Sequence, residues 1–286
     1  MSTLKKAQYK CFELSVENQI AHIKLSRPEQ LNSMIPEFWT ELPQLVRELD
    51  DSGEVRVIVI SSTGKHFSAG MDLSVFTNMA KDFKGEPARR AEKMRRSVLA
   101  LQDAFNALEQ ARMPVLCAIQ GGAIGGAVDM ISAADCRYCT KDAFFTIKET
   151  QIGMTADVGT LQRLPHLIPQ GLMRELAFTG RNWQAHEALE CGFVNQVYED
   201  ASSMLEGVME VAKVIAGHSP MAVSGCKQMI NYTRDHSVTD SLEYMATWQS
   251  GMFQMPDIME AMQAQQEKRG PRYDDLLPRN TLLSND

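Results

Sequence analysis

The segment 114-PVLCAIQGGAIGGAVDM-130 decides the expected fold. It begins with an apolar run that is typical of a buried strand, and the small residues from Gly121 to Gly126 then form a loop. The residues after this loop predict a helix that carries Asp129. Strand, loop and helix in this order build α/β folds, and open α/β sheets bind their ligands at the carboxyl ends of the strands.

The same alternation recurs over the first 200 residues. In chain order, the sequence predicts a hairpin, a helix, a strand, a second small-residue loop, a long helix and a short strand: 10–27, Pro36 to about Leu49, 55-VRVIVISS-62, 63-TGKHFSAGMDL-73, a helix that ends near Ala111, and 135-DCRYCTK-141.

From about Ser202 onward no strand pattern remains. The segment 219-SPMAVSGCKQMINYT-233 and the amphipathic stretch from Val238 to about Gln266 predict Met-rich helices. Flexible thioethers fill irregular apolar gaps, so a Met stripe is more typical of a core or a subunit interface than of a ligand site. We therefore expect an α/β core with the active site over residues 1–200 and a helical region over residues 201–286.

The composition excludes several classes of protein. The chain has 286 residues, of which 44% are hydrophobic and 23% are charged, as in ordinary globular proteins. Its formal net charge of -7 argues against nucleic-acid binding, which needs clustered Lys and Arg. No window is apolar enough for a membrane span, so we expect no membrane partner.

The termini and the cysteines suggest a location. MSTLKKAQYK lacks the apolar run of a signal peptide, and LLSND is not a peroxisomal address. The six cysteines are scattered, and Cys136 and Cys139 form a CxxC in an expected strand, where residues three apart point to opposite faces. Reduced thiols and a cytoplasmic protein are therefore expected.

Three acidic residues stand out among glycine, alanine and apolar residues: Asp129, Glu149 and Asp157. In an apolar pocket the pKa of a carboxyl rises, and a second carboxylate raises it further, so one acid can hold a proton while another is ionised. The three acids therefore indicate a proton-transfer site. Singly, Asp129 could cap local backbone, Asp157 could occupy a turn or N-cap, and Glu149 could be a surface strand residue.

The two glycine-rich loops do not match phosphate-binding motifs. GGAIGG is not a GxGxxG in the right frame with an acidic residue about 20 positions on, and no Lys-Ser/Thr pair completes a P-loop. Such loops can instead bring backbone N–H groups close to a developing negative charge. No His, Cys or carboxylate group has the spacing of metal ligands, so no metal is expected.

Four segments resemble the crotonase (enoyl-CoA hydratase/isomerase) superfamily: 27-RPEQLNSM-34, 66-HFSAGMDL-73, 119-IQGGAIGGAVDMISAADCRY-138 and 159-GTLQRLP-165. The resemblance implies a ββα spiral core and a helical C-terminal region that assembles into homotrimers or homohexamers. It also implies a coenzyme A thioester substrate and no separate cofactor. The thioester oxygen would lie between the amides of Met71 and Gly126. Further contacts to the substrate would come from the same two loops, at Ala69, Gly70, Asp72 and Gly125.

The identities of the three acids favour one activity within the superfamily. Hydratases of this superfamily carry glutamate at the positions of Asp129 and Glu149, and commonly glycine at that of Asp157. The order Asp, Glu, Asp with separations of 20 and 8 resembles the dienoyl-CoA isomerases. We therefore expect conversion of 3,5-dienoyl-CoA to 2,4-dienoyl-CoA in the β-oxidation of unsaturated fatty acids. Hydration of 2-enoyl-CoA is the alternative enzyme activity. A non-catalytic or RNA-binding homologue would more typically have lost the acids or gained a basic helix.

This reaction assigns a role to each acid. Removal of a proton from C2 leaves charge that spreads to C6, so a base near C2 and an acid near C6 must be separated. The resemblance places Glu149 near C2 and thus Asp157 at the distal end, although the reverse order stays open. Asp129 would modulate charge or hold a water, and His66 is expected to be a positioned loop residue.

Overall fold

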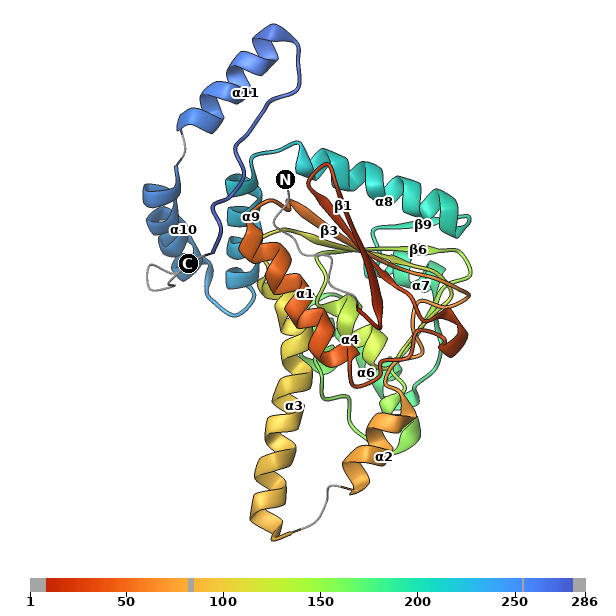
Figure 1. Cartoon of the computed structure of the whole chain (residues 1–286). Coiled ribbons are helices and arrows are strands. Elements are labelled where there is room, and N and C mark those ends of the chain that lie inside the picture. Colours follow the sequence, from red (N-terminus) through yellow and green to blue (C-terminus); the bar gives the residue numbers. More distant parts are fainter. Residues whose placement is uncertain (1–8, 82–84, 254, 280–286) are drawn as a thin grey trace.

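The structure is a computed structural model that describes residues 9–81, 85–253 and 255–279. It is a mixed α/β fold in which helices surround a six-stranded sheet and a smaller three-stranded sheet (Figure 1). The strands are β1 (Phe12–Glu17), β2 (Ile20–Leu25), β3 (Val57–Ser62), β4 (Val115–Ile119), β5 (Gly122–Ile124), β6 (Cys136–Thr140), β7 (Phe144–Thr146), β8 (Trp183–Gln184) and β9 (Gln196–Tyr198). The α-helices are α1 (Phe38–Ser52), α2 (Leu73–Lys81), α3 (Pro87–Gln110), α4 (Gly126–Ser132), α5 (Thr160–Arg163), α6 (Gln170–Thr179), α7 (Ala185–Glu190), α8 (Ala201–Ala216), α9 (Pro220–Thr233), α10 (Val238–Met252) and α11 (Met255–Glu267). Three short 3-10 helices complete the elements: η1 (Pro28–Gln30), η2 (Glu149–Ile152) and η3 (Leu164–His166).

The large sheet has the order β1-β2-β3-β4-β6-β9. The expected hairpin is confirmed, because β1 and β2 pair antiparallel with Phe12 opposite Leu25. Every later pair is parallel, as βαβ crossovers require. The α/β fold class is therefore confirmed.

Helices cover both faces of this sheet, which is why β3 is buried along its whole length. Val57 and Val59 face α8, where they pack with buried residues such as Met204 and Val208. Ile58 points to the opposite face and joins a larger core that includes residues of α1, α3 and α4. A strand buried on both faces reads as a continuous apolar run, as 55-VRVIVISS-62 does.

The small sheet corrects one detail of the sequence analysis. Residues 121–126 were expected to form a loop, but they contain strand β5, which pairs with β7 in the order β5-β7-β8. Isolated bridges join Ser68 to Ala123 and Met34 to Met71. The glycine and alanine content hid this strand because such residues have low β-propensity, and here tertiary pairing decides the conformation.

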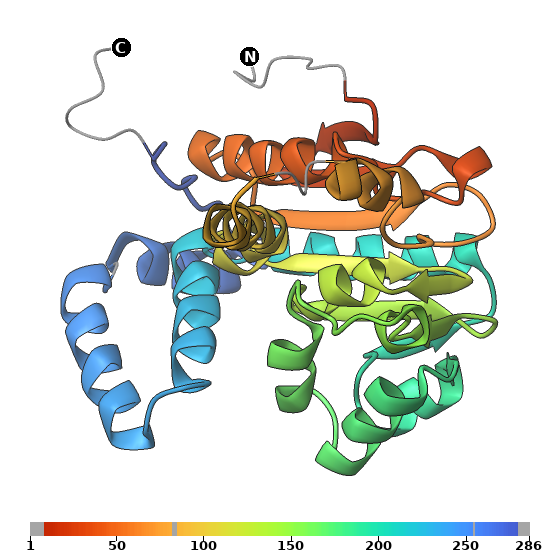
Figure 2. The same cartoon turned by 90° about the horizontal axis from the view of Figure 1, so that it is seen from below.

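Helices α9 to α11 gather at one end of the large sheet (Figures 1 and 2). The single amphipathic stretch expected from Val238 to Gln266 is two helices, because α10 ends at Met252 and α11 begins at Met255. Residues after α11 return to the core, where Asp275 pairs with the buried Arg56 at 2.8 Å. Within the described ranges no helix is long and apolar enough to cross a membrane.

The cysteines form no disulfide. All six lie within the described residues and all six are free. Cys139 is buried in β6, whereas Cys136 is only partly buried.

Candidate active site

Two small-residue loops lie side by side at the carboxyl ends of β3 and β4. The Phe67 amide donates to the Gln120 carbonyl at 2.8 Å, and the Ser68 amide donates to Gly122 at 3.2 Å. In return the Ile124 amide donates to the Ser68 carbonyl at 3.1 Å. These ladder-like bonds bring the 66–72 loop against the 121–126 segment, as the expected α/β layout required.

Glycine is required at two positions in these loops. Gly70 has a φ of +81°, and a side chain there would overlap the Ile124 carbonyl oxygen. Gly125 has a φ of 54° and a ψ of -121°, which L-residues rarely adopt. Gly70 therefore permits a close approach of two backbone segments, and Gly125 permits a backbone conformation that would strain a larger residue.

The amides of Met71 and Gly126 are free to bind an oxyanion. Among the described residues, neither amide donates to another backbone carbonyl, whereas the adjacent Asp72 and Gly125 amides donate to Met34 and Thr146. The two free amides are close together, because a Cβ built on Gly126 would lie 3.9 Å from the Met71 nitrogen. Gly126 is also the first residue of α4, so its N–H has no acceptor within the helix.

Asp129 lies in α4 with its carboxyl group enclosed by protein. The residue is only 1% exposed, and its Oδ1 accepts a 2.6 Å hydrogen bond from the Thr160 amide at the start of α5. Its Oδ2 is buried without a partner among the described residues. Burial raises the pKa of Asp129 to about 6; the Thr160 hydrogen bond and Arg163 oppose this rise, and the negative charge of Asp157 adds to it. Asp129 therefore binds the backbone of a segment 31 residues away. The alternative that it caps its own local backbone is wrong.

Glu149 begins η2, three residues after the last residue of β7. Its Oε1 lies 3.1 Å from the position that a Cβ on Gly125 would occupy, so this carboxyl group lies against the residue that precedes the free Gly126 amide. Its Oε2 is buried without a partner among the described residues. Burial raises the pKa of Glu149 to about 7, and the charges of Asp129 and Asp157 reinforce the shift. The surface-strand reading is therefore wrong for this residue.

Asp157 lies in the loop between η2 and α5 and is half-buried. Its backbone carbonyl accepts a 2.7 Å hydrogen bond from Gln102 of α3. Burial raises the pKa of Asp157 above its ordinary value. Since Asp157 contributes to the pKa shifts of both Asp129 and Glu149, the structure brings the three predicted acids into one electrostatic cluster.

Other predicted residues hold the first loop. Asp72 accepts hydrogen bonds from the Ser33 hydroxyl at 2.7 Å and the Ser74 amide at 2.9 Å, and these bonds lower its pKa. The Ala69 amide donates to Leu31 at 2.9 Å. His66 is a positioned loop residue, because its Nδ1 accepts from the Gly122 amide at 2.9 Å.

Three residues that hold the loops and Asp129 in place were not predicted from the sequence. Asn32 is buried and donates to the carbonyls of Thr63 and His66, and Ser68 donates to the Asn32 carbonyl at 2.8 Å. Thr160 supplies the amide that holds Asp129. Each belongs to a segment that carried the family resemblance, but each partner lies about 30 or more residues away, where sequence patterns do not reach.

The arrangement suits removal of a proton beside a carbonyl group. Two preorganised amides can stabilise an enolate oxygen while a neighbouring carboxylate accepts the proton. Within the part of the chain that the structure describes, no cluster of His, Cys, Asp or Glu could hold a metal ion.

Comparison with known proteins identifies a family and several similar enzymes. The family model for enoyl-CoA hydratase/isomerase matches residues 15–276. The mitochondrial delta(3,5)-delta(2,4)-dienoyl-CoA isomerase of Mus musculus is 44% identical over 89% of this chain and 79% of its own length. The peroxisomal delta(3,5)-delta(2,4)-dienoyl-CoA isomerase of Arabidopsis thaliana is 40% identical over 93% of this chain and 97% of its own length. A short-chain-enoyl-CoA hydratase of Clostridium acetobutylicum is 30% identical over 90% of this chain and 94% of its own length.

Solved structures agree with the fold. The enoyl-CoA hydratase of Bacillus anthracis superposes with a TM-score of 0.83 at 29% identity and covers 92% of this chain and 99% of its own. A putative enoyl-CoA hydratase from Streptomyces coelicolor A3(2) superposes with a TM-score of 0.85, and at 23% identity this likeness concerns the fold alone; it covers 96% of this chain and 98% of its own.

The expected cytoplasmic location is wrong. It conflicts with the similar isomerases, which are named mitochondrial in Mus musculus and peroxisomal in Arabidopsis thaliana. Free cysteines supported the expectation, but they distinguish reducing from oxidising surroundings and do not separate one reducing compartment from another.

Proposed function

The chain belongs to the enoyl-CoA hydratase/isomerase family, and from this premise we propose that it converts 3,5-dienoyl-CoA to 2,4-dienoyl-CoA. The chain is an enzyme, and its similarity to dienoyl-CoA isomerases extends over about 90% of its length. One observation carries the chemistry: three carboxyl groups with raised pKa values influence one another, and one of them, Glu149, lies against Gly125, next to the free amide of Gly126.

The reaction moves both double bonds of the diene by one carbon toward the thioester, without net gain or loss of atoms. A carboxylate removes a proton from C2, and the electron pair of that C–H bond delocalises onto the thioester oxygen and along the diene to C6. A carboxylic acid then donates a proton to C6, which leaves double bonds at C2 and C4. The amides of Met71 and Gly126 bind the negative oxygen, and each such donor is worth roughly 2.7–4 kcal/mol in other enzymes.

The position of Glu149 supports its role at C2. The thioester oxygen is bonded to C1, so a carboxyl group beside the amides that bind this oxygen is also close to C2. Glu149 Oε1 lies against Gly125, next to one of those amides. Asp157 comes from a separate loop and supplies the acid at C6, whereas Asp129 sets the charge between them or holds a water. Bound substrate excludes water from half-buried Asp157, which favours the protonated form that this role needs.

Further contacts and the assembly belong to the same proposal. Ala69, Gly70, Asp72 and Gly125 contact the substrate, and coenzyme A enters as part of the substrate, with no other cofactor. Residues 201–286 carry the contacts between copies in a trimer or hexamer. Exposed apolar side chains on α9 to α11 support this assembly, among them Ile230, Leu242, Met252, Met259 and Met262.

Hydration of 2-enoyl-CoA is the second candidate. The 30% identity to a short-chain-enoyl-CoA hydratase favours it, and Asp129 and Glu149 could hold a water between them. Asp157 argues against it, because a carboxyl group at the distal end of the pocket has no task in hydration.

The test compares two substrates with the purified protein. Incubation with a 3,5-dienoyl-CoA should produce the longer-wavelength absorbance of a diene conjugated with the thioester. A 2-enoyl-CoA should lose little of its absorbance in the same time. Rapid loss of the enoyl absorbance without conversion of the diene would replace the isomerase assignment with the hydratase.

A further inference from the structure

One face of α3 forms hydrogen bonds with the segment that carries Asp157. Gln102, Asn106 and Glu109 are spaced four and three residues apart, so they share one face of the helix; we refer to these three residues as the α3 stripe. Gln102 donates to the Asp157 carbonyl at 2.7 Å. The other two members bind Arg163, six residues further along the same segment.

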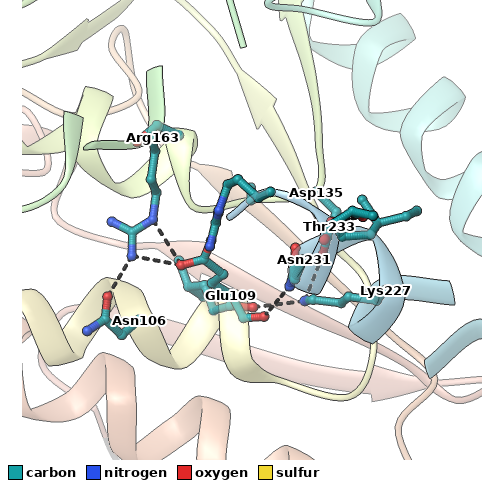
Figure 3. Close-up of polar contacts among 12 residues, drawn as sticks. Asn106, Glu109, Asp135, Arg163, Lys227, Asn231 and Thr233 are labelled. Carbon is teal, nitrogen blue, oxygen red and sulfur yellow. Dashed lines mark hydrogen bonds and ion pairs between the residues drawn. The ribbon is translucent and has the colours of Figure 1, made fainter. Parts of the chain in front are cut away.

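Arg163, at the C-terminal end of that segment, binds it to α3. It is 8% exposed, and its Nε and Nη2 donate to Glu109 Oε2 at 3.1 and 3.0 Å, while Nη2 also donates to Asn106 at 2.6 Å (Figure 3). A side chain at Gly159 would overlap the guanidinium group, so the loop passes directly over Arg163.

Two of the three acids depend on this segment. Asp157 lies within it, and Asp129 is held by the amide of Thr160, three residues after Asp157. A shift of the segment would therefore move one carboxyl group and release the other. Neither Arg163 nor a member of the α3 stripe is among the residues that we assign to contact with the substrate.

We propose that Arg163 and the α3 stripe are positioning residues of the isomerase, which hold residues 157–160 so that Asp157 and Asp129 keep their places relative to Glu149. This proposal rests on the proposed function. A displacement of about 1 Å in reacting groups can cost about 100-fold in rate, so such a support is needed for two-carboxylate proton transfer.

The same contacts control the charge near Asp129. The positive charge of Arg163 opposes the rise in the pKa of Asp129, and Glu109 in turn balances Arg163. Burial alone would raise the pKa of Glu109, but Arg163 and Arg234 lower it below its ordinary value, so Glu109 is ionised at neutral pH. The charged or titratable groups around this arrangement are Asp157 and Glu149 on the side of Asp129, and Arg234, His166 and Asp235 on the side of Arg163.

The support continues into the helical C-terminal region. Arg234, which follows α9, forms an ion pair with the other oxygen of Glu109, and Asn231 of α9 donates to the Glu109 carbonyl at 3.2 Å (Figure 3 labels Asn231). Glu109 therefore links the active-site segment to α9.

The experiment uses full-length protein with three substitutions that separate charge from geometry. Arg163→Gln removes the positive charge, Glu109→Gln leaves that charge unbalanced, and Arg163→Lys keeps the charge but loses the planar, two-donor geometry. Asn106→Ala removes one hydrogen bond without changing charge. The matched control is Asp103→Asn on the same helix, which breaks the exposed pair with Arg47.

The expected results are a fall in kcat of about 10- to 100-fold for the Arg163 and Glu109 variants, with little change in KM. The titration of Asp129 should move to higher pH in Arg163→Gln, which removes the opposing positive charge, and to lower pH in Glu109→Gln. It should stay in place in Arg163→Lys and in Asp103→Asn. A residue that only stabilised the fold would not shift this titration in opposite directions.

A substrate-free readout separates this proposal from the proposed function. In protein labelled with ¹³C at the aspartate carboxyl groups, the Asp129 titration should move in the same two opposite directions. Inactive wild-type protein would overturn the isomerase assignment, but the titration would still test the link. Unchanged kcat and an unchanged Asp129 titration in folded variants would overturn the positioning role. If the charge variants do not fold, Arg163→Lys and Asn106→Ala decide: wild-type kcat in both would overturn it.

Discussion

Replacement of Asp129 by Asn should stabilise the protein at pH 8 and lose part of that effect at lower pH. Burial raises the pKa of this carboxyl from 3.8 to about 6 in the folded protein, so its ionised form is disfavoured by folding. A shift of this size corresponds to about 3 kcal/mol at pH values above the folded pKa. The cost is fully present above pH 6 and disappears as the pH falls through 6 toward the unfolded pKa, where both states bind the proton.

The amide keeps the geometry of the carboxyl group. Its oxygen can still accept from the Thr160 amide, and its NH2 takes the place of the unpartnered Oδ2. An unsatisfied buried NH2 costs about 1–3 kcal/mol, but this cost is independent of pH. The sharp prediction is therefore the pH dependence: the stability of the variant relative to the wild type should decrease by about 1.5 kcal/mol between pH 8 and pH 5.

Urea unfolding at several pH values, followed by circular dichroism, measures this difference. Asp103→Asn serves as the control, because Asp103 is 45% exposed and its pair with Arg47 should contribute little at any pH. If the stabilities of the variant and the wild type change in parallel from pH 8 to pH 5, burial does not raise the pKa of Asp129. The reasoning that folding disfavours the ionised form of this carboxyl group is then refuted.

Three further predictions concern activity and the loops. Glu149→Gln should lower kcat by about 10²- to 10⁴-fold with little effect on KM, in steady-state kinetics with a 3,5-dienoyl-CoA; an unchanged kcat would exclude this residue as the base. For the wild type, kcat/KM should fall as the pH drops through about 7, because burial raises the pKa of Glu149 to that value and the base must be ionised; a flat profile from pH 6 to pH 8 would contradict this. Gly125→Ala should destabilise the protein by about 1–3 kcal/mol and reduce kcat, because a φ of 54° strains alanine and the new Cβ would press on Glu149. Gly171→Ala, at a helical position with open space, should be neutral in thermal unfolding, and equal losses in both glycine variants would contradict the strain argument.

Local patterns predicted the parts of the fold that depend on local physics. The β1–β2 hairpin, the apolar strand β3 and the helix that begins at Gly126 all follow from periodicity and small residues within a short window. The short strand β5 did not follow, because its pairing with β7 and its bridge to Ser68 decide its conformation. The break between α10 and α11 also escaped prediction, since the amphipathic pattern continues across it.

For the site, the sequence identified the acids but not what holds them. Asp129, Glu149 and Asp157 stand out because charged residues are rare among glycine, alanine and apolar neighbours. The link from Asp129 to Thr160 spans 31 residues, and the pair of Arg163 and Glu109 spans 54. Such contacts depend on how α3 and α5 pack together, which no pattern along the chain encodes.

The most direct test of the two-carboxylate proposal is the fate of protons during turnover in D2O. A 3,5-dienoyl-CoA should be incubated with wild-type protein and with Asp157→Asn, and the acyl chain analysed by NMR. The proposal predicts that wild-type product carries deuterium at C6, and that Asp157→Asn still exchanges the C2 protons of the substrate while forming little product. In the proposed mechanism, Glu149 removes one proton and Asp157 donates another. This mechanism would be contradicted if the original C2 proton were transferred to C6 in the wild type. It would also be contradicted if Asp157→Asn lost C2 exchange together with isomerisation.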